Sequence, residues 1–136
     1  MRIRSVLLAL SMPVLLAVTA LAADTDIVVR AATEDFRHQV NEYQARVNQL
    51  NFSRAPSPSA RQGMHETIVN NYRVHLTAMT RARDDRRREL AGMRGVSPPE
   101  RSDASRRIGI VYNTEVKTLQ MHEQDALRRL SEAERR

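Results

Sequence analysis

Apolar residues recur in steps of three and four along much of the chain, the spacing of one face of an α-helix. The pattern is unbroken between residues 29 and 50, and it continues between residues 69 and 93 and, less regularly, between 108 and 133. The first stretch consists of Val29, Thr33, Phe36, Val40, Tyr43, Val47 and Leu50. Such spacing is typical of helices that pack along their whole length, so three long helices are predicted.

The second break between these stretches carries a complete set of helix-stop and helix-start residues. Gly95 suits the left-handed residue that follows a helix, and Ser97 suits the N-cap of the next one. Pro98 suits the first helical position, and Glu100 completes a capping box with Ser97. A helix is therefore predicted to begin at residue 98.

The first break, residues 51–59, is rich in proline and serine. Ser59 and Gln62 match the S-x-x-Q capping box, which predicts a helix start at residue 60. The acidic segment 24–26 offers a cap and favourable charge to the first helix. The helices are expected at about 25–51, 60–94 and 98–134.

These helices predict an all-α fold and one helical domain over residues 24–136. A helix of about 35 residues is roughly 50 Å long, so we expect an elongated antiparallel three-helix bundle or coiled-coil-like helices. An apolar stripe of two residues in seven covers little area. A homo-oligomer is therefore an open alternative, in which a second copy buries part of each stripe.

The N-terminal segment has the three parts of a secretory signal peptide. Arg2 and Arg4 form a basic start, residues 6–23 carry no charge, and the exit is Ala-Leu-Ala. A signal peptide over residues 1–22, cleaved near Ala22 or Ala23, would send the protein to the periplasm or the medium. The alternative is an uncleaved segment that anchors the chain in the inner membrane, because about eighteen apolar residues reach the lower limit for a span.

The composition excludes a cysteine-based framework and makes one class of partner unexpected. The chain of 136 residues has no Cys and no Trp, and its formal net charge of +6 falls to +4 once Arg2 and Arg4 leave with the signal peptide. Without Cys there is no disulfide or Cys-zinc framework. An exported chain with so small a net charge and few aromatic residues is not expected to bind nucleic acid.

An arginine-rich run, residues 81–89, is the first candidate site. Arg83 and Arg86 occupy positions where the apolar stripe expects buried residues, so they must leave the core or meet a carboxylate or phosphate. Together with Arg87 they are candidates for contact with an anionic partner, either a protein or an anionic envelope surface. The competing interpretation is a solvated face with the ion pairs Arg81–Asp85 and Asp84–Arg88.

Histidine and methionine residues supply the second candidate, a copper or zinc site. The tripeptide Met-His-Glu occurs at residues 64–66 and 121–123. Antiparallel packing would place His75 and His122 at about the same height along the bundle axis as His38. The thioether of methionine is a soft ligand that can add to such a site. The candidate ligands are His75, His122, Met79 and Met121. No metal-binding spacing such as H-x-x-x-H is present, and the competing interpretation is histidines that are solvated or hydrogen-bonded.

No catalytic motif is present: the sequence lacks G-x-S-x-G, H-E-x-x-H, a phosphate-binding glycine loop and a Cys nucleophile. The exported, Cys-free helical composition resembles the periplasmic stress and metal-resistance adaptors of the Spy and CpxP type. The Leu-Thr-x-x-Gln repeats of that group are missing, and residues 76–80 lack the Gln. We therefore expect a non-enzymatic interaction or adaptor module of the bacterial cell envelope without a cofactor, or alternatively a periplasmic metal-binding or metal-stress protein.

Overall fold

The computed structural model describes residues 12–54 and 57–135, with side chains from residue 24 to 53 and from 57 onward. The described chain is all-helical, as the sequence predicts. It consists of three α-helices and one short 3-10 helix: α1 (Met12–Asn48), η1 (Phe52–Arg54), α2 (Pro58–Gly92) and α3 (Pro98–Glu134).

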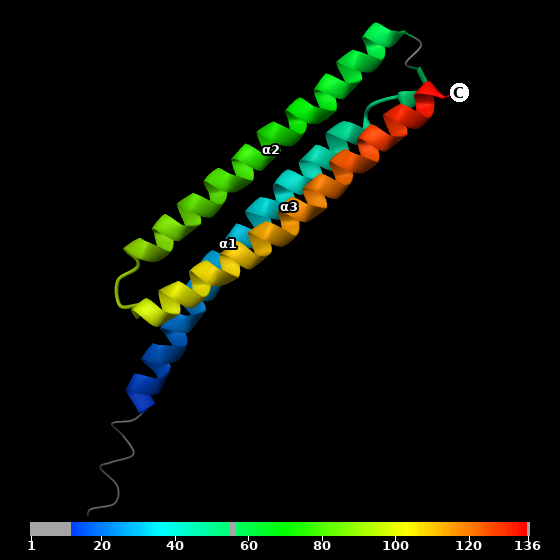
Figure 1. Cartoon of the computed structure of the whole chain (residues 1–136). Coiled ribbons are helices and arrows are strands. Elements are labelled where there is room, and N and C mark those ends of the chain that lie inside the picture. The colour runs from blue at the N-terminus through cyan, green and yellow to red at the C-terminus, as the bar shows by residue number, and fades with distance from the viewer. Residues whose placement is uncertain (1–11, 55–56, 136) are drawn as a thin grey trace, which may run out of the picture.

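The three α-helices lie alongside one another as a long bundle (Figure 1). α2 runs antiparallel to α1 and α3, which are parallel to each other, and each helix packs against both of the others. α1 extends past the α2–α3 connection at its N-terminal end. The bundle that the sequence predicts is therefore present in the described residues.

The start of α1 differs from the predicted start near residue 25. The helix begins at Met12, so the acidic segment 24–26 lies within it and not at its start. Ala and Leu dominate residues 14–23, and both favour helix, so no residue there interrupts the backbone hydrogen bonding. Residues 1–11 of the predicted signal peptide lie outside the described residues, and for 12–22 only the backbone is described.

No helix among the described residues combines the length and the apolar character that crossing a membrane requires.

α2 begins two residues before the predicted start. Its N-cap is Ser57 instead of Ser59, and the Ser57 hydroxyl accepts a hydrogen bond from the Ala60 backbone N–H at 3.1 Å. Pro58 follows directly at the first helical position, where its fixed φ and missing N–H cost nothing. Ser59 is not the N-cap because the helix has already begun at Pro58, directly after Ser57.

The start of α3 is confirmed. Gly95 has φ of 79°, the left-handed conformation that only glycine adopts without strain. The Ser97 hydroxyl accepts from the Glu100 N–H at 3.4 Å, and the Ser97 N–H donates to the Glu100 carboxylate at 3.0 Å. This capping box gives two backbone N–H groups the acceptors that they would otherwise lack, and so fixes where α3 begins.

One continuous apolar core runs along the bundle axis. α1 contributes the predicted stripe, with Thr33 and Leu50 half-buried at its edges. The buried residues of α2 include Ile68 and His75, whereas the predicted Val69 and Leu76 are only half-buried. The predicted Met79 and Leu90 are buried. α2 contacts helices on two sides, so its buried face is wider than a two-stranded seam and is centred between the neighbours. The largest fully buried side chains are Tyr43, Phe36, Ile68, Met79, Leu90, Ile108 and Leu119.

Candidate functional site

Arg86 finds its carboxylate inside the chain. Its guanidinium contacts Asp35 of α1 through Nε and Nη2, both at 2.9 Å, and Glu89 of its own helix through Nη1 at 2.9 Å. The hydrogen bond that Arg86 donates to Glu89 makes the largest contribution to raising the Arg86 pKa; partial burial opposes it, and Asp35 adds to it. Of the two outcomes expected for Arg86, leaving the core or meeting an anion, the structure shows a contact with a carboxylate, which Asp35 supplies from α1.

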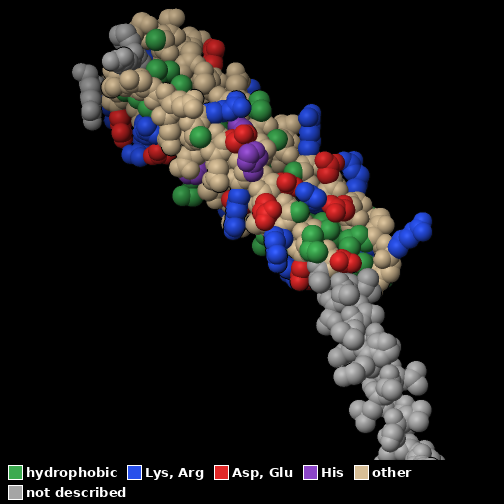
Figure 2. All heavy atoms as spheres, turned by 180° about the vertical axis from the view of Figure 1, so that it is seen from behind, with side chains coloured by type: hydrophobic (Ala, Val, Ile, Leu, Met, Phe, Trp, Pro, Cys, Tyr) green, Lys and Arg blue, Asp and Glu red, His purple; other side chains and the backbone are tan. Residues whose placement is uncertain are grey.

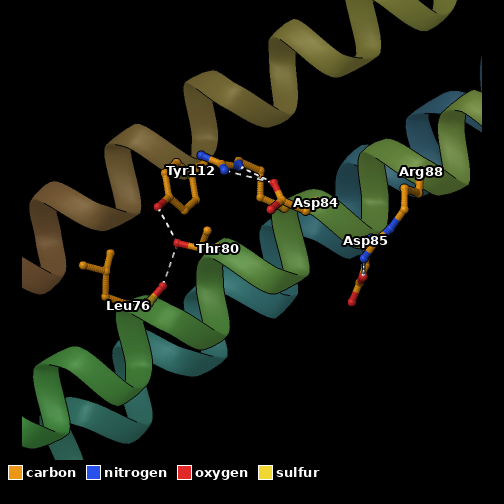
Figure 3. A network of polar contacts seen from close by, with 7 residues as sticks. Leu76, Thr80, Asp84, Asp85, Arg88 and Tyr112 are labelled. Atoms are coloured by element: carbon orange, nitrogen blue, oxygen red, sulfur yellow. Dashed lines mark hydrogen bonds and ion pairs between the residues drawn. The ribbon is translucent and has the colours of Figure 1, made fainter.

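Arg83 stacks on an aromatic ring at the α2–α3 seam. Its Cζ lies 4.6 Å from the centre of the Tyr112 ring, and Nη2 is 2.9 Å from Asp84 Oδ1. Figure 3 shows the Tyr112 hydroxyl facing Thr80, at 2.9 Å, while Thr80 donates to the Leu76 carbonyl at 2.9 Å. The guanidinium thus stays at the edge of the core through a cation–π contact, and it joins α2 to α3.

The two surface ion pairs predicted in this run are wrong in detail. Arg88 pairs with Asp85 instead of Asp84, and Asp84 pairs with Arg83 (Figure 3). Residues three apart on a helix are neighbours just as residues four apart are, so both geometries compete. Arg83 is held at the seam by Tyr112, which places its guanidinium beside Asp84 and leaves Arg88 to Asp85.

Arg87 has a different environment from its neighbours in the run. Its guanidinium reaches α3, where Nη2 lies 3.0 Å from the position that a Cβ would take at Gly109. Figure 2 shows basic and acidic side chains lying next to one another on one face of the rod. Arg83, Arg86 and Arg88 of the run each form an ion pair. Three arginines are predicted to contact an anion. Arg83 and Arg86 each pair with a carboxylate of this chain, whereas the Arg87 guanidinium lies against Gly109 of α3.

Breaking the cross-helix pair separates its contribution from that of the surface pairs. In a double-mutant cycle of Asp35→Ala and Arg86→Ala, we expect a coupling energy of about 0.5–1 kcal/mol, the upper end for partly exposed ion pairs. The same cycle on Asp103 and Arg106, an exposed pair within α3, is expected to give less than about 0.5 kcal/mol. Urea denaturation followed by circular dichroism measures both. Equal couplings would show that the Asp35 contact does not link α1 to α2.

His75 is the buried polar side chain at the centre of the bundle. It is 3% exposed, its Nδ1 lies 2.8 Å from Gln39 Oε1, and its ring meets Tyr43 edge-on at 6.0 Å between centroids. Burial lowers the His75 pKa, and the positive charge of Arg46 lowers it further. The ring is therefore neutral, with Nδ1–H donating to Gln39, and Nε2 has no hydrogen-bond partner among the described residues.

The four candidate metal ligands occupy different environments. Met79 is fully buried, whereas Met121 is 68% exposed on α3 and His122 is half-buried. Only His75 and Met79, four residues apart on α2, share the core. Among the described side chains, no group of three or more histidine and acidic residues stands close enough to hold a metal ion.

Motif reasoning does not find Glu123 and Tyr43, two residues whose pKa the bundle raises. Burial is the main cause that raises the pKa of Glu123, while Arg73 and His65 oppose it. Tyr43 is fully buried, and burial followed by the charge of Glu123 raises the pKa of its hydroxyl. The Tyr43 hydroxyl donates to the Ile68 carbonyl at 3.5 Å. The sequence signals this contact in one way: Tyr43 lies on the apolar stripe of α1, so its hydroxyl is expected to be buried and to need a hydrogen-bond partner.

Open grooves follow the seams between the helices, and arginines line them. Arg30 and Arg107 line a groove of about 440 Å³ between α1 and α3, and Arg87 and Arg101 line one of about 330 Å³ between α2 and α3. Arg61 lines a third, of about 430 Å³, near the start of α2. The surface of the described bundle thus offers guanidinium groups in shallow depressions.

No protein-family model, no curated protein and no solved structure matches this chain.

Proposed function

We propose that this protein is an exported, non-enzymatic interaction module: a helical rod that binds an anionic partner through guanidinium groups in the seams between its helices. The observation that carries the proposal is that arginine lines each of these open grooves, with Arg87 and Arg101 together in one of them. Guanidinium groups suit carboxylate and phosphate because their N–H donors form a planar fork. Shallow, open grooves favour surface contact over the enclosed binding that catalysis requires.

The location is proposed from the sequence. A basic start, an uncharged apolar stretch and an Ala-Leu-Ala exit favour export to the periplasm or the medium, with cleavage near Ala22. If the segment is not cleaved, α1 leads directly from the membrane anchor into the bundle, and the grooves near its start would lie close to the headgroups. Both locations expose the rod to anionic lipids and to envelope proteins.

Binding to anionic surfaces tests the proposal. The protein recovered from cells that express the full chain is expected to sediment with phosphatidylglycerol vesicles at about 0.02 M salt and to dissociate at about 0.5 M, because salt screens exposed charges. Phosphatidylcholine vesicles are the control and should not retain it. Polyglutamate serves as the protein-like probe in the same experiment. A protein that binds neither anionic probe at low salt would refute the proposal.

A further inference from the structure

The groove between the last turns of α2 and the first turns of α3 has a lining suited to one anion. Arg87 and Arg101 approach it from the two helices, Ser102 and Ser105 add hydroxyl groups, and Leu90 is part of its apolar floor. None of the described residues that line it carries a carboxylate. The Arg30–Arg107 groove, by contrast, includes Asp26, which pairs with Arg107. The described lining of the α2–α3 groove therefore combines two arginines with no carboxylate of its own to neutralise them.

Gly109 gives Arg87 its place in this groove. A glycine in the middle of α3 costs about 1 kcal/mol of helix stability relative to alanine, so its presence calls for a structural reason. The nearest atom to a Cβ at this position would be Arg87 Nη2, at 3.0 Å. The missing side chain leaves room for the guanidinium to lie against α3, one helical turn beyond Ser105.

Arg101 is held at the other side of the groove. Its Nη1 donates to the Ala91 carbonyl near the end of α2 at 3.2 Å, which uses one of five N–H donors and fixes the guanidinium. The positive end of α3 and the negative end of α2 lie side by side here, so their dipoles oppose each other. Attraction for an anion in this groove consequently depends on the two arginines.

We infer that this groove is a binding site for a phosphate group, held by Arg87 and Arg101 with Ser102 and Ser105 as hydroxyl donors. Two guanidinium forks and two hydroxyls offer more donors than the two oxygens of a carboxylate can accept, whereas a phosphate accepts at three or four oxygens. The inference rests on the proposed function and assigns the anion contact to Arg87 with Arg101, in place of Arg83 and Arg86. The phosphate belongs to a phospholipid headgroup or to a soluble phosphate ester.

A glycine substitution tests the site without changing any charge. Gly109→Ala places a methyl group 3.0 Å from Arg87 Nη2, a contact tight enough to shift the guanidinium. We expect it to weaken phosphate binding about fivefold by moving one charged donor. Gly63→Ala is the matched control, because a Cβ there meets nothing within 4 Å. Both variants are expected to fold at least as well as the original chain, since alanine favours helix. Inorganic phosphate is titrated while backbone amide shifts of Ser102 and Ser105 are followed by NMR.

A second pair of variants separates the site from general charge. Arg87→Gln with Arg101→Gln removes two charges from the groove, and Arg88→Gln with Arg106→Gln removes two from pairs outside it. We expect the first to abolish the phosphate-induced shifts and the second to leave them within about twofold, because phosphate contacts depend on placed donors. Vesicles of phosphatidylglycerol, with glycerol phosphate as the soluble counterpart, distinguish the two sources of the phosphate.

The outcomes distinguish the site from the proposed function. Loss of phosphate binding in Gly109→Ala but not in Gly63→Ala supports the site, whichever phosphate source binds more tightly. Equal loss in the two double variants, or phosphate shifts away from Ser102 and Ser105, overturns the site while anionic vesicle binding can still stand. Shifts at these two serines without any binding to vesicles or polyglutamate keep the site and refute the broader proposal. An absence of shifts with all phosphate probes refutes the site.

Discussion

Replacing Phe36 by alanine is expected to lower the free energy of unfolding by about 3–5 kcal/mol. Phe36 is completely buried on α1, and its ring meets Tyr112 of α3 edge-on at 5.6 Å between centroids. Truncation removes the transfer free energy of the ring and leaves a cavity in the core between α1 and α3, which long packed helices cannot easily close. Domains of this size are stable by only about 5–15 kcal/mol, so the change removes a large share.

Urea denaturation followed by helical circular dichroism measures this loss. Val74→Ala on α2 is the control, because Val74 is 61% exposed and its truncation should cost less than about 0.5 kcal/mol. The Tyr112 ring also contacts the Arg83 guanidinium. Phe36→Ala should therefore weaken the packing of α2 against α3 and increase the rate of proteolysis there. A loss below about 1 kcal/mol for Phe36→Ala would contradict the packing described for the core.

Acidification is expected to destabilise the bundle through His75. The unfolded chain binds a proton near the ordinary histidine pKa of 6.5, whereas burial lowers the pKa of the folded His75. Stability is thus complete above about pH 7.5 and falls as the pH decreases through 6.5 toward the folded pKa, by about 1.4 kcal/mol for each unit by which the two values differ. Glu42 opposes the shift, and Arg46 and His38 support it, all from α1.

The measurement is a series of urea denaturation curves between about pH 8 and 5, with the slope interpreted as proton uptake on unfolding. His75→Met should abolish most of this slope, because it removes the titrating group and keeps an apolar side chain of similar size. His65→Gln is the control, since His65 is exposed on the first half of α2. An unchanged slope in His75→Met would mean that other groups cause the acid sensitivity.

Local sequence rules determine the fold where several of them agree. At the start of α3, Gly95, Ser97, Pro98 and Glu100 all indicate the same boundary, and the structure has it. At the start of α2, two serines compete, and the proline that follows Ser57 decides between them. The helix preference of the N-terminal apolar segment overrides the acidic residues that look like a cap for α1.

The candidate site is less predictable, because it depends on which helix faces which. The heptad count correctly places Arg86 on an inward stripe, but only the packing of α1 on α2 brings Asp35 to it. The same count puts His75 beside the stripe, whereas a helix with two neighbours buries it at the centre. Gly109 is unremarkable in the sequence, and its relation to Arg87 emerges only when α2 and α3 are side by side.

Because the bundle has an odd number of long helices among its described residues, the chain enters at one end of the rod and finishes at the other. The described chain enters at the start of α1, and the C-terminal end of α3 lies at the opposite end of the bundle (Figure 1). A helix with the 37 residues of α3 is about 55 Å long. Because α1 extends past the α2–α3 connection, its start lies at least that far from the C-terminal end of α3 (Figure 1). The bundle therefore keeps its two ends apart, and the groove lined by Arg87 and Arg101 lies toward the end at which α1 starts.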